Sequence, residues 1–279
     1  MIPTVRLPDG TAIPALDQGT WHMGENVSRA GAEADALRAG IERGMTLIDT
    51  AEMYGSGGSE RVVARAIAGQ RERVFLVSKV LPHNASAAGV ARAAAASLKR
   101  LGTDRIDLYL LHWPGSHPLE DTIGAFEKLR AAGDIRYWGV SNFDLAGMRE
   151  VVGFASGALC ATDQVLYHPD QRGIEFDLLP WCRERGMPAM AYSPLGQAGR
   201  LLRSPALAAV AARHGATPAQ VAIAWSLRDG NTISIPKASD PAHVAANAAS
   251  GGLRLTPADL AEIDAAHPPP ARRTPLGML

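Results

Sequence analysis

The sequence of 279 residues has little cysteine, few aromatic residues and no excess of charge of either sign. Its two cysteines, Cys160 and Cys182, stand apart, with no Cys-x-x-Cys pair and no Cys/His cluster nearby. This pattern excludes a disulfide framework and gives no sign of a metal site. Basic and acidic residues are equal in number, 28 of each, and form no basic stripe for a nucleic acid backbone. We therefore expect no metal, no nucleic acid partner and two reduced, structural cysteines.

Long apolar runs and a secretion signal are also missing. The first ten residues lack the positive start and apolar stretch of a signal peptide, and no segment approaches 18 uninterrupted apolar residues. With 47% hydrophobic and 20% charged residues, the composition is that of an ordinary globular protein with ample material for a large core. These observations predict a cytoplasmic protein that does not interact with a membrane.

Short apolar runs alternate with longer segments of helical spacing about eight times along the chain. Each run has the length and composition of a buried parallel strand. The predicted strands are residues 15–19, 46–49, 74–79, 107–112, 137–142, 161–164, 189–193 and 232–236. Ahead of them, residues 5–14 contain an Asp9-Gly10 turn between extended pieces, which predicts a small hairpin that covers the bottom of a barrel.

Glycine, proline and capping residues mark the ends of several predicted helices. Gly40 and Gly44 are expected to close one helix, and Ser239-Asp240-Pro241 supplies a capping residue followed by proline at the first turn of another. The richest glycine stretch, residues 55–58, lacks the Lys-Ser/Thr of a phosphate loop and is interpreted as a loop that opens a helix.

The alternation is compatible with either a closed barrel or an open sheet with helices on both faces. No Gly-x-Gly-x-x-Gly follows the first predicted strand, so the phosphate loop of an open dinucleotide-binding sheet is missing. We therefore expect a single α/β domain over residues 1–279, a (β/α)8 TIM barrel. The proline-rich residues 268–279 are expected to form a C-terminal tail over the barrel mouth.

Polar residues end three consecutive predicted strands, at the edge of a barrel where its chemistry occurs. The second strand ends in Asp49, the third in Lys79 and the fourth in His112, while Tyr54 follows five residues after Asp49. Singly, each is explained by capping, packing or solvation. Together, an Asp, a Tyr, a Lys and a His on successive βα units predict a catalytic site without a metal.

The acid–base properties of these side chains suggest a proton donor beside an oxyanion site. Tyrosine is a poor acid at neutral pH, and the ammonium of Lys79 is expected to lower the pKa of Tyr54. Asp49 can pair with Lys79 and keep it protonated, while His112 can donate a hydrogen bond toward a carbonyl oxygen.

These four residues are similar to the catalytic tetrad of the aldo-keto reductase superfamily. The resemblance extends in the family's order over essentially the whole chain, through Gly19-Thr20-Trp21, Leu47 to Gly55, Val77-Ser78-Lys79, Leu110 to Pro114, Gly139 to Phe143, Gln164, Tyr192 to Leu195 and Ile235-Pro236-Lys237. It implies a reductase that transfers hydride from C4 of a nicotinamide to a small carbonyl compound, with Tyr54 protonating the oxygen.

The resemblance also implies which residues bind NADPH across the barrel mouth. Ser141, Asn142 and Gln164 would hydrogen-bond the carboxamide, Tyr192 would stack on the ring, and Ser193, Leu195 and Gln197 would lie along the pyrophosphate. The full implied set is Gly19, Thr20, Trp21, Asp49, Ser141, Asn142, Gln164, Tyr192, Ser193, Pro194, Leu195, Gln197, Lys237, Ser239, His243 and Asn247.

The adenosine end departs from the family's pattern. Many NADPH-dependent members have a Lys-Ser pair, with an Arg, a Glu and an Asn at six, nine and ten positions beyond the Lys. Lys237 and Asn247 match, but Ala238, His243 and Ala246 replace the Ser, the Arg and the Glu. Lys237, helped by Ser239 or by the helix that starts near Pro241, can still contact a 2′-phosphate, whereas Asp240 adds local repulsion. NADPH is therefore predicted with weaker discrimination against NADH.

The implied substrate site contains Trp21, Tyr54, His112 and Trp113, with Met53 as a further apolar neighbour. Residues 52–54, 164–168 and 178–182 are most similar to bacterial members that reduce methylglyoxal and other 2-oxoaldehydes. The natural substrate, the preference between cofactors and the direction of the reaction stay open at this point. A monomer is expected from the resemblance.

Two alternatives remain from the sequence. One is a regulatory subunit similar to the potassium-channel subunits of the same superfamily, which binds nicotinamide cofactor without turnover. The other is a phosphate-binding isomerase or aldolase that uses Lys79 as a Schiff-base nucleophile. Asp49 counts against the second, because it favours the charged ammonium.

Overall fold

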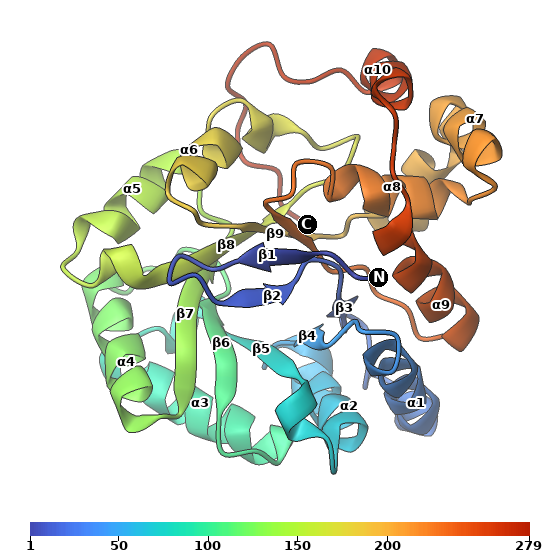
Figure 1. Ribbon diagram of the computed structural model, residues 1–279. Helices are drawn as coiled ribbons and strands as arrows, with labels where there is room; N and C mark the ends of the chain where they lie inside the picture. The colour runs from blue at the N-terminus through green and yellow to red at the C-terminus, as the bar shows by residue number, and fades with distance from the viewer.

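Eight parallel strands run side by side in chain order in the computed structural model, which describes all 279 residues (Figure 1). The strands are β3 (Gln18–Gly19), β4 (Leu47–Asp49), β5 (Phe75–Val80), β6 (Ile106–Leu111), β7 (Ile135–Ser141), β8 (Cys160–Leu166), β9 (Ala189–Tyr192) and β10 (Thr232–Ser234). The helices are α1 (Ala30–Ile41), α2 (Gly58–Ile67), α3 (Ala87–Leu101), α4 (Leu119–Ala132), α5 (Leu145–Gly153), α6 (Leu178–Glu184), α7 (Pro205–His214), α8 (Pro218–Ser226), α9 (Pro241–Ala249) and α10 (Pro257–Ala266).

The first and last strands close the sheet into a barrel. Parallel bridges join Leu16 to Ser234 and Gly19 to Lys237, and the amide of Gly19 donates to the carbonyl of Pro236 at 3.1 Å. A Cβ on Gly19 would lie 2.7 Å from the carbonyl oxygen of Ile235, so only glycine permits this approach. The predicted (β/α)8 barrel is confirmed, and each predicted run overlaps one strand, with bounds that differ by a few residues.

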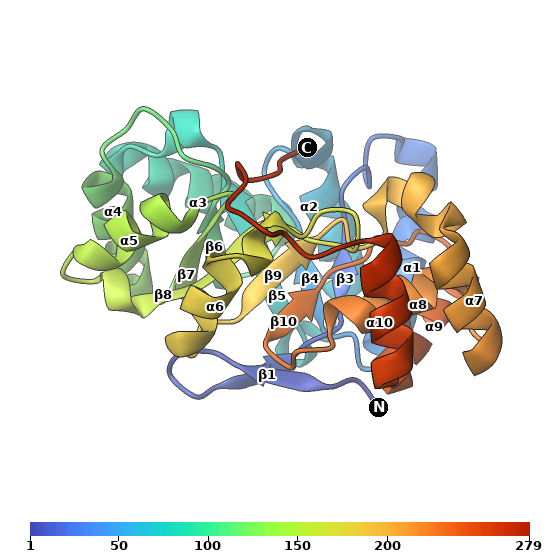
Figure 2. The same ribbon diagram turned by 90° about the horizontal axis from the view of Figure 1, so that it is seen from above.

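The N-terminal hairpin covers the bottom of the barrel, as predicted. Strands β1 (Thr4–Arg6) and β2 (Ala12–Pro14) pair antiparallel, and Gly10 takes the positive φ of +87° that the turn requires. Val5, Leu7 and Ile13 are buried against the apolar side chains that point into the barrel. Figure 2 shows the hairpin at the end of the molecule opposite the C-terminus. The bottom is therefore closed, and the mouth is the open end.

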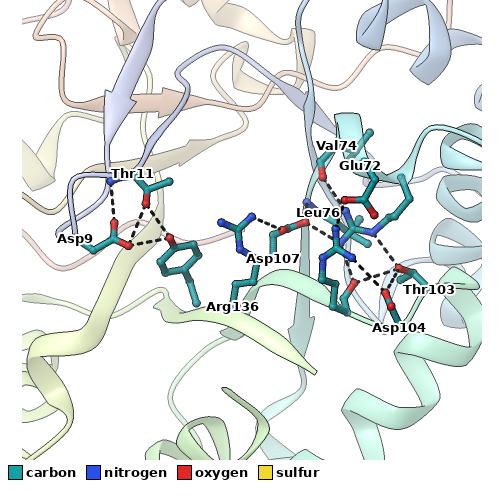
Figure 3. Close-up of polar contacts among 12 residues, drawn as sticks. Asp9, Thr11, Glu72, Val74, Leu76, Thr103, Asp104, Asp107 and Arg136 are labelled. Carbon is teal, nitrogen blue, oxygen red and sulfur yellow. Dashed lines mark hydrogen bonds and ion pairs between the residues drawn. The ribbon is translucent and has the colours of Figure 1, made fainter. Parts of the chain in front are cut away.

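A buried polar cluster also stabilises the bottom end (Figure 3). Asp107, near the start of β6, accepts from Arg71 at 2.8 Å, from the amide of Leu76 at 2.9 Å and from Arg136 at 3.1 Å. Asp107 is 2% exposed, and these donors come from three adjacent segments, so the carboxylate ties β5, β6 and β7 together. Its place at the bottom makes it structural.

Most helix boundaries follow the sequence signals. Asp240 caps α9 by accepting from the amides of Ala242 and His243, with Pro241 in the first turn. Gly44, at φ +88°, terminates the turn after α1. The prediction that Gly40 closes the same helix is wrong. Gly40 lies inside α1, where a Cβ would collide with the side chain of Gln18, so its small size serves packing.

The C-terminal tail crosses the barrel mouth after α10, which confirms the prediction for residues 268–279 (Figure 2). Arg273 reaches Asp144 and Asp177 at 3.2 Å each, and the last two residues, Met278 and Leu279, line a cavity at the mouth. Cys160 and Cys182 are buried and unpaired. None of the helices has the length and apolar character needed to cross a membrane.

Candidate active site

The four predicted catalytic side chains meet at the barrel mouth. Asp49 is the last residue of β4, Lys79 lies one residue before the end of β5, and His112 directly follows β6. Tyr54 begins a 3-10 turn, Tyr54–Gly57, in the loop between β4 and α2. Because the strands are parallel and adjacent, their carboxyl ends bring these groups together.

Lys79 is the centre of this group and is fully buried. Its Nζ donates to the carboxylate of Asp49 at 2.8 Å and to the carbonyl of Thr50 at 2.9 Å. A third contact, at 3.3 Å, is with the hydroxyl of Tyr54. Burial opposes the charge, but Asp49 and Tyr54 outweigh it and raise the pKa of Lys79 above its usual value. The ammonium has three protons and three partners, so no lone pair is free for a Schiff base.

The pKa of Tyr54 does not follow the prediction. Burial raises the pKa of this phenol above its ordinary value, and the opposing effect of Lys79 is smaller; Asp49 adds to the rise. The expected lowering by Lys79 is therefore present as a contribution, but the net direction was predicted wrongly. Tyr54 consequently carries its proton at neutral pH, as a proton donor must.

His112 is held neutral beside Tyr54. Burial, followed by the charge of Lys79, lowers the pKa of His112 to about 3. The rings of Tyr54 and His112 meet edge to face with centroids 5.7 Å apart. Nδ1 of His112 is buried and has no hydrogen-bond partner in the protein. A neutral imidazole at neutral pH can donate one hydrogen bond to an oxygen bound between it and Tyr54.

The loop that carries Tyr54 is fixed by close backbone contacts. Gly55 has a φ of +54°, which glycine adopts readily, and Ser56 has a φ of +51°. A Cβ on Gly58 would lie 2.3 Å from the carbonyl oxygen of Gly24, so the two loops touch backbone to backbone. This contact explains Gly58, the last residue of the glycine-rich stretch 55–58, which opens α2 as predicted.

The predicted carboxamide-binding residues lie next to the first four. Asn142, with a φ of +62° just after β7, donates from Nδ2 to the carbonyl of His112 at 3.1 Å. Its Oδ1 accepts from the hydroxyl of Tyr192 at 2.9 Å. Ser141 donates to the backbone carbonyl of Gln164 at 2.8 Å, and Gln164 donates to Asp49 at 2.8 Å. One hydrogen-bonded network therefore joins the two halves of the site.

A central cavity opens above this network. Its lining residues are Gly19, Thr20, Trp21, Asp49, Met53, Tyr54, His112, Trp113, Ser141, Asn142, Gln164, Tyr192, Ser193, Ile235, Lys237, Met278 and Leu279. A side groove continues from it, lined by Trp21, His22, Ser193, Pro194, Leu195, Gln197, Ala198, Pro236 and Lys237. The two spaces share Trp21, Ser193 and Lys237 in their linings.

The side groove has the backbone shape of an anion site. Ser193 has a positive φ of 49°, Leu195 has a negative φ of −97°, and Gly196, Gln197 and Ala198 follow with positive φ values of 54°, 55° and 55°. The change of hand between Leu195 and Gly196 can turn successive amide groups toward one concavity. This is the segment that the sequence assigned to a pyrophosphate.

Some predicted residues line neither space, and some that do are already hydrogen-bonded within the protein. Thr20 is buried and donates to the carbonyl of Asp49 at 2.8 Å while accepting from Ser59 at 2.7 Å, so its hydroxyl is already used in the loop structure. Lys237 donates to Ser239 at 3.3 Å on the exposed side of the groove. His243 is exposed and Asn247 is buried in α9, and neither lines the central cavity or the side groove.

Several lining residues had not been singled out from the sequence as site residues, including His22, Ile235, Ala198, Met278 and Leu279. His22 and Ala198 neighbour predicted residues, and Ile235 lies within the Ile-Pro-Lys segment, so adjacency was an available signal. Arg29, which donates to Ser239 at 3.4 Å, carried no signal at all. It precedes α1 and is 210 positions from its partner.

Known proteins resemble this chain over its full length. A sequence profile of the Aldo/keto reductase family matches residues 15–268. Methylglyoxal reductase YeaE of Escherichia coli strain K12 is 52% identical over 279 residues, which cover 99% of this chain and 98% of that protein. Glyoxal reductase of Bacillus subtilis strain 168 is 34% identical over 262 residues, covering 94% of this chain and 92% of that protein.

Solved structures agree with the sequence comparison. The crystal structure of an aldo-keto reductase from Klebsiella pneumoniae in complex with NADPH superimposes with a TM-score of 0.98 at 49% identity, and the match covers 100% of both chains. A second structure of an aldo/keto reductase from Klebsiella pneumoniae, in complex with NADP and acetate, gives a TM-score of 0.97. These relatives offer no support for the channel-subunit alternative.

Proposed function

Because this chain belongs to the aldo/keto reductase family, we propose that it reduces small aldehydes and ketones with NADPH, using Tyr54 as the proton donor. The observation that carries the proposal is the contact of Tyr54 with the buried Lys79–Asp49 pair at the floor of a cavity that also contains His112. Methylglyoxal reductase YeaE of Escherichia coli, which shares about half of its residues with this chain, supports the proposal.

The central cavity and the side groove suit a nicotinamide dinucleotide. Tyr192 offers a flat ring, and Asn142 and Gln164 offer amides for a carboxamide in the cavity. The left-handed turns of the side groove offer backbone amides for a pyrophosphate. When bound, the nicotinamide supplies a hydride to a carbonyl carbon. NADP-bound relatives support NADPH, and we propose that NADH is accepted less well.

Tyr54 and His112 would bind the carbonyl oxygen from two sides. The neutral imidazole of His112 donates a hydrogen bond that stabilises negative charge on the oxygen. Tyr54 then gives its proton to that oxygen, which is a far stronger base than a phenolate once it has become an alkoxide. Lys79 stabilises the phenolate that remains, since its ammonium is 3.3 Å from the phenolic oxygen. Asp49 keeps Lys79 charged and in place.

We propose 2-oxoaldehydes, of which methylglyoxal is the simplest, as the substrate class. Trp21, Met53 and Trp113 give the central cavity an apolar wall that favours small, weakly polar molecules. The relatives named for methylglyoxal and glyoxal support the same class. No charged side chain faces the cavity apart from the Asp49 carboxylate, which Lys79 neutralises, and the exposed Lys237.

The test is Tyr54→Phe, which removes one oxygen and leaves the ring. Oxidation of NADPH at 340 nm in the presence of methylglyoxal should fall by about 10² to 10⁴ in kcat, the usual effect of losing a general acid. NADPH binding, followed by quenching of tryptophan fluorescence, should stay within about twofold of wild type, because the hydroxyl contacts the carbonyl oxygen rather than the cofactor.

Tyr137→Phe is the matched control, since the Tyr137 hydroxyl binds Asp9 at the barrel bottom, far from the mouth. It should keep full turnover. Undiminished turnover by Tyr54→Phe would reject Tyr54 as the acid. A wild type that oxidises NADPH with none of a panel of 2-oxoaldehydes, aromatic aldehydes and keto sugars would reject the reductase proposal.

A further inference from the structure

Two positively charged hydrogen-bond donors converge on one hydroxyl at the end of the side groove. Lys237 lines the groove and donates from Nζ to Oγ of Ser239 at 3.3 Å. Arg29, from the short turn before α1, donates from Nη2 to the same oxygen at 3.4 Å. Two side chains of like charge thus share a single neutral acceptor, although α1 and the segment after β10 are far apart in the sequence.

The hydroxyl of Ser239 adds a third hydrogen-bond donor to this place. An alcohol oxygen has two lone pairs and one proton, and Lys237 and Arg29 direct donors at the lone pairs. The hydroxyl proton is left to point elsewhere. A guanidinium, an ammonium and a hydroxyl in one place can all donate hydrogen bonds to a ligand that only accepts them. A phosphate is such a ligand.

No carboxylate contacts this pair of cations directly. Neither Arg29 nor Lys237 makes an ion pair with an acidic side chain. Glu25 and Glu33 act on Lys237 only from a distance, since Glu25 binds His22 at 2.7 Å and Glu33 accepts from the amide of Gly24 at 2.8 Å. Two like charges that share one hydroxyl and contact no carboxylate favour a site for an external anion.

The first turn of α9 is not free to bind that anion. Asp240 accepts from the amides of Ala242 and His243, so the helix end is already capped by a carboxylate of its own. His243 is exposed on α9 and its side chain lines neither the groove nor the cavity. The positive charge at this end of the groove therefore comes from Lys237 and Arg29 alone.

We propose that Arg29 binds the 2′-phosphate of NADPH together with Lys237 and Ser239, and so sets the preference for NADPH over NADH. This inference rests on the proposed function. The left-handed turns at Ser193 and Gln197 offer a separate place for the pyrophosphate, which leaves the donor cluster for the second phosphate. The planar guanidinium of Arg29 can make two parallel hydrogen bonds to it, and its charge does not depend on pH.

The experiment measures equilibrium binding without turnover. Dissociation constants for NADPH, NADH and 2′,5′-ADP are determined by calorimetry for wild type, Arg29→Ala, Arg29→Lys and Ser239→Ala. Arg29→Ala should weaken NADPH and 2′,5′-ADP by about 10- to 100-fold, the usual range for losing hydrogen bonds to a charged partner, and leave NADH within about twofold. Arg29→Lys should recover part of the loss, because charge returns without the planar fork.

Arg65→Ala is the matched control, because Arg65 is exposed in the last turn of α2 and its side chain makes no hydrogen bond or ion pair. Its affinities should equal those of wild type. If Arg29→Ala weakens NADPH and NADH equally, the group bound is the pyrophosphate and the inference is wrong. Unchanged NADPH affinity also overturns it while the proposed function stands. A wild type that binds neither dinucleotide overturns both.

Discussion

The ammonium of Lys79 and the carboxylate of Asp49 are both removed from water, and each is the partner of the other at 2.8 Å. Breaking such a pair leaves an uncompensated buried charge. Lys79→Met should therefore lower the free energy of unfolding by about 3–5 kcal/mol, as measured by urea denaturation at pH 7. Adding Asp49→Asn should restore part of the loss, because the orphaned charge disappears. Losses that simply add would contradict the coupling.

His112 gives the protein a pH-dependent stability with a defined sign. An unfolded chain binds a proton at this imidazole below about pH 6.5, whereas the folded protein, in which the pKa is lowered to about 3, does not. Between these values the unfolded state holds more protons, so the free energy of unfolding falls as the pH falls. His112→Gln should remove up to about 1.4 kcal/mol per pH unit from that slope.

Urea denaturation of the cofactor-free protein at pH values from 7 to 4 would measure this slope. His168→Gln provides a comparison, since burial lowers the pKa of His168 to about 4 and its contribution should end there. A slope for His112→Gln equal to that of wild type would show that this imidazole is protonated in the folded state. That result would also remove the neutral hydrogen-bond donor from the proposed reaction.

At the scale of single residues, the sequence predicted which side chains meet at the barrel mouth better than it predicted their pKa values. Asp49, Tyr54, Lys79 and His112 were recognisable because each stands at or near the end of an apolar run, which is a local pattern. The direction of the pKa shift of Tyr54 was not, because it depends on how far burial outweighs one ammonium. Arg29 was missed for a related reason, since its contact spans 210 positions and no local pattern marks it.

At the scale of elements, the runs predicted as strands all overlap strands, but several of their ends differ. The first, predicted over residues 15–19, has only Gln18–Gly19 in the sheet, although Leu16 also bridges to Ser234. Hydrogen bonds to the last strand continue along it, and they form only when the barrel closes. Hydrogen bonds that depend on the closure of the barrel cannot be predicted from a single run of residues. Gly40 was misassigned because its neighbour, Gln18, is likewise distant in sequence.

Gly19 lies where the first and last strands meet and also lines the central cavity. A substitution at Gly19 therefore tests the closure of the barrel. Gly19→Ala places a methyl group 2.7 Å from the carbonyl oxygen of Ile235 and should cost about 1–3 kcal/mol, as overpacking usually does. Gly124→Ala is the control, since Gly124 lies inside α4 with nothing within 4 Å of a new Cβ. It should raise stability by about 0.5–1 kcal/mol. Thermal unfolding distinguishes the expected loss of stability in Gly19→Ala from the expected gain in Gly124→Ala. A Gly19→Ala variant as stable as wild type would show that the first and last strands of the barrel separate easily.

At the scale of the whole molecule, the tail connects the far end of the chain to the site. After α10, His267 bridges Asp170 at 2.7 Å and Ser204 at 2.8 Å, and Arg273 then reaches Asp144 and Asp177. These anchors lie before the last two residues. Met278 and Leu279 are 51% and 63% exposed, yet they line the central cavity. They therefore contribute little to folding and directly to the shape of the site.

Deleting Met278 and Leu279 should consequently separate stability from specificity. The melting temperature should stay close to that of wild type, because exposed side chains away from the core change stability by less than about 0.5 kcal/mol. The KM for methylglyoxal should rise by about three- to tenfold, since an apolar wall worth roughly 1 kcal/mol of contact is lost. The kcat should hold, because Tyr54, Lys79 and His112 are untouched.

A bulky aromatic aldehyde should respond in the opposite direction, because removing the wall makes room at the mouth. The KM for the aromatic aldehyde should stay level or fall. The ratio of kcat/KM between the two substrates therefore measures the effect of the tail on specificity. Leu159→Ala serves as the control, since Leu159 is 45% exposed and lies in the turn before β8, at the bottom of the barrel. If truncation changes both substrates in the same proportion, the tail supports the cofactor or the fold instead. If neither changes, the last two residues lie away from the bound substrate.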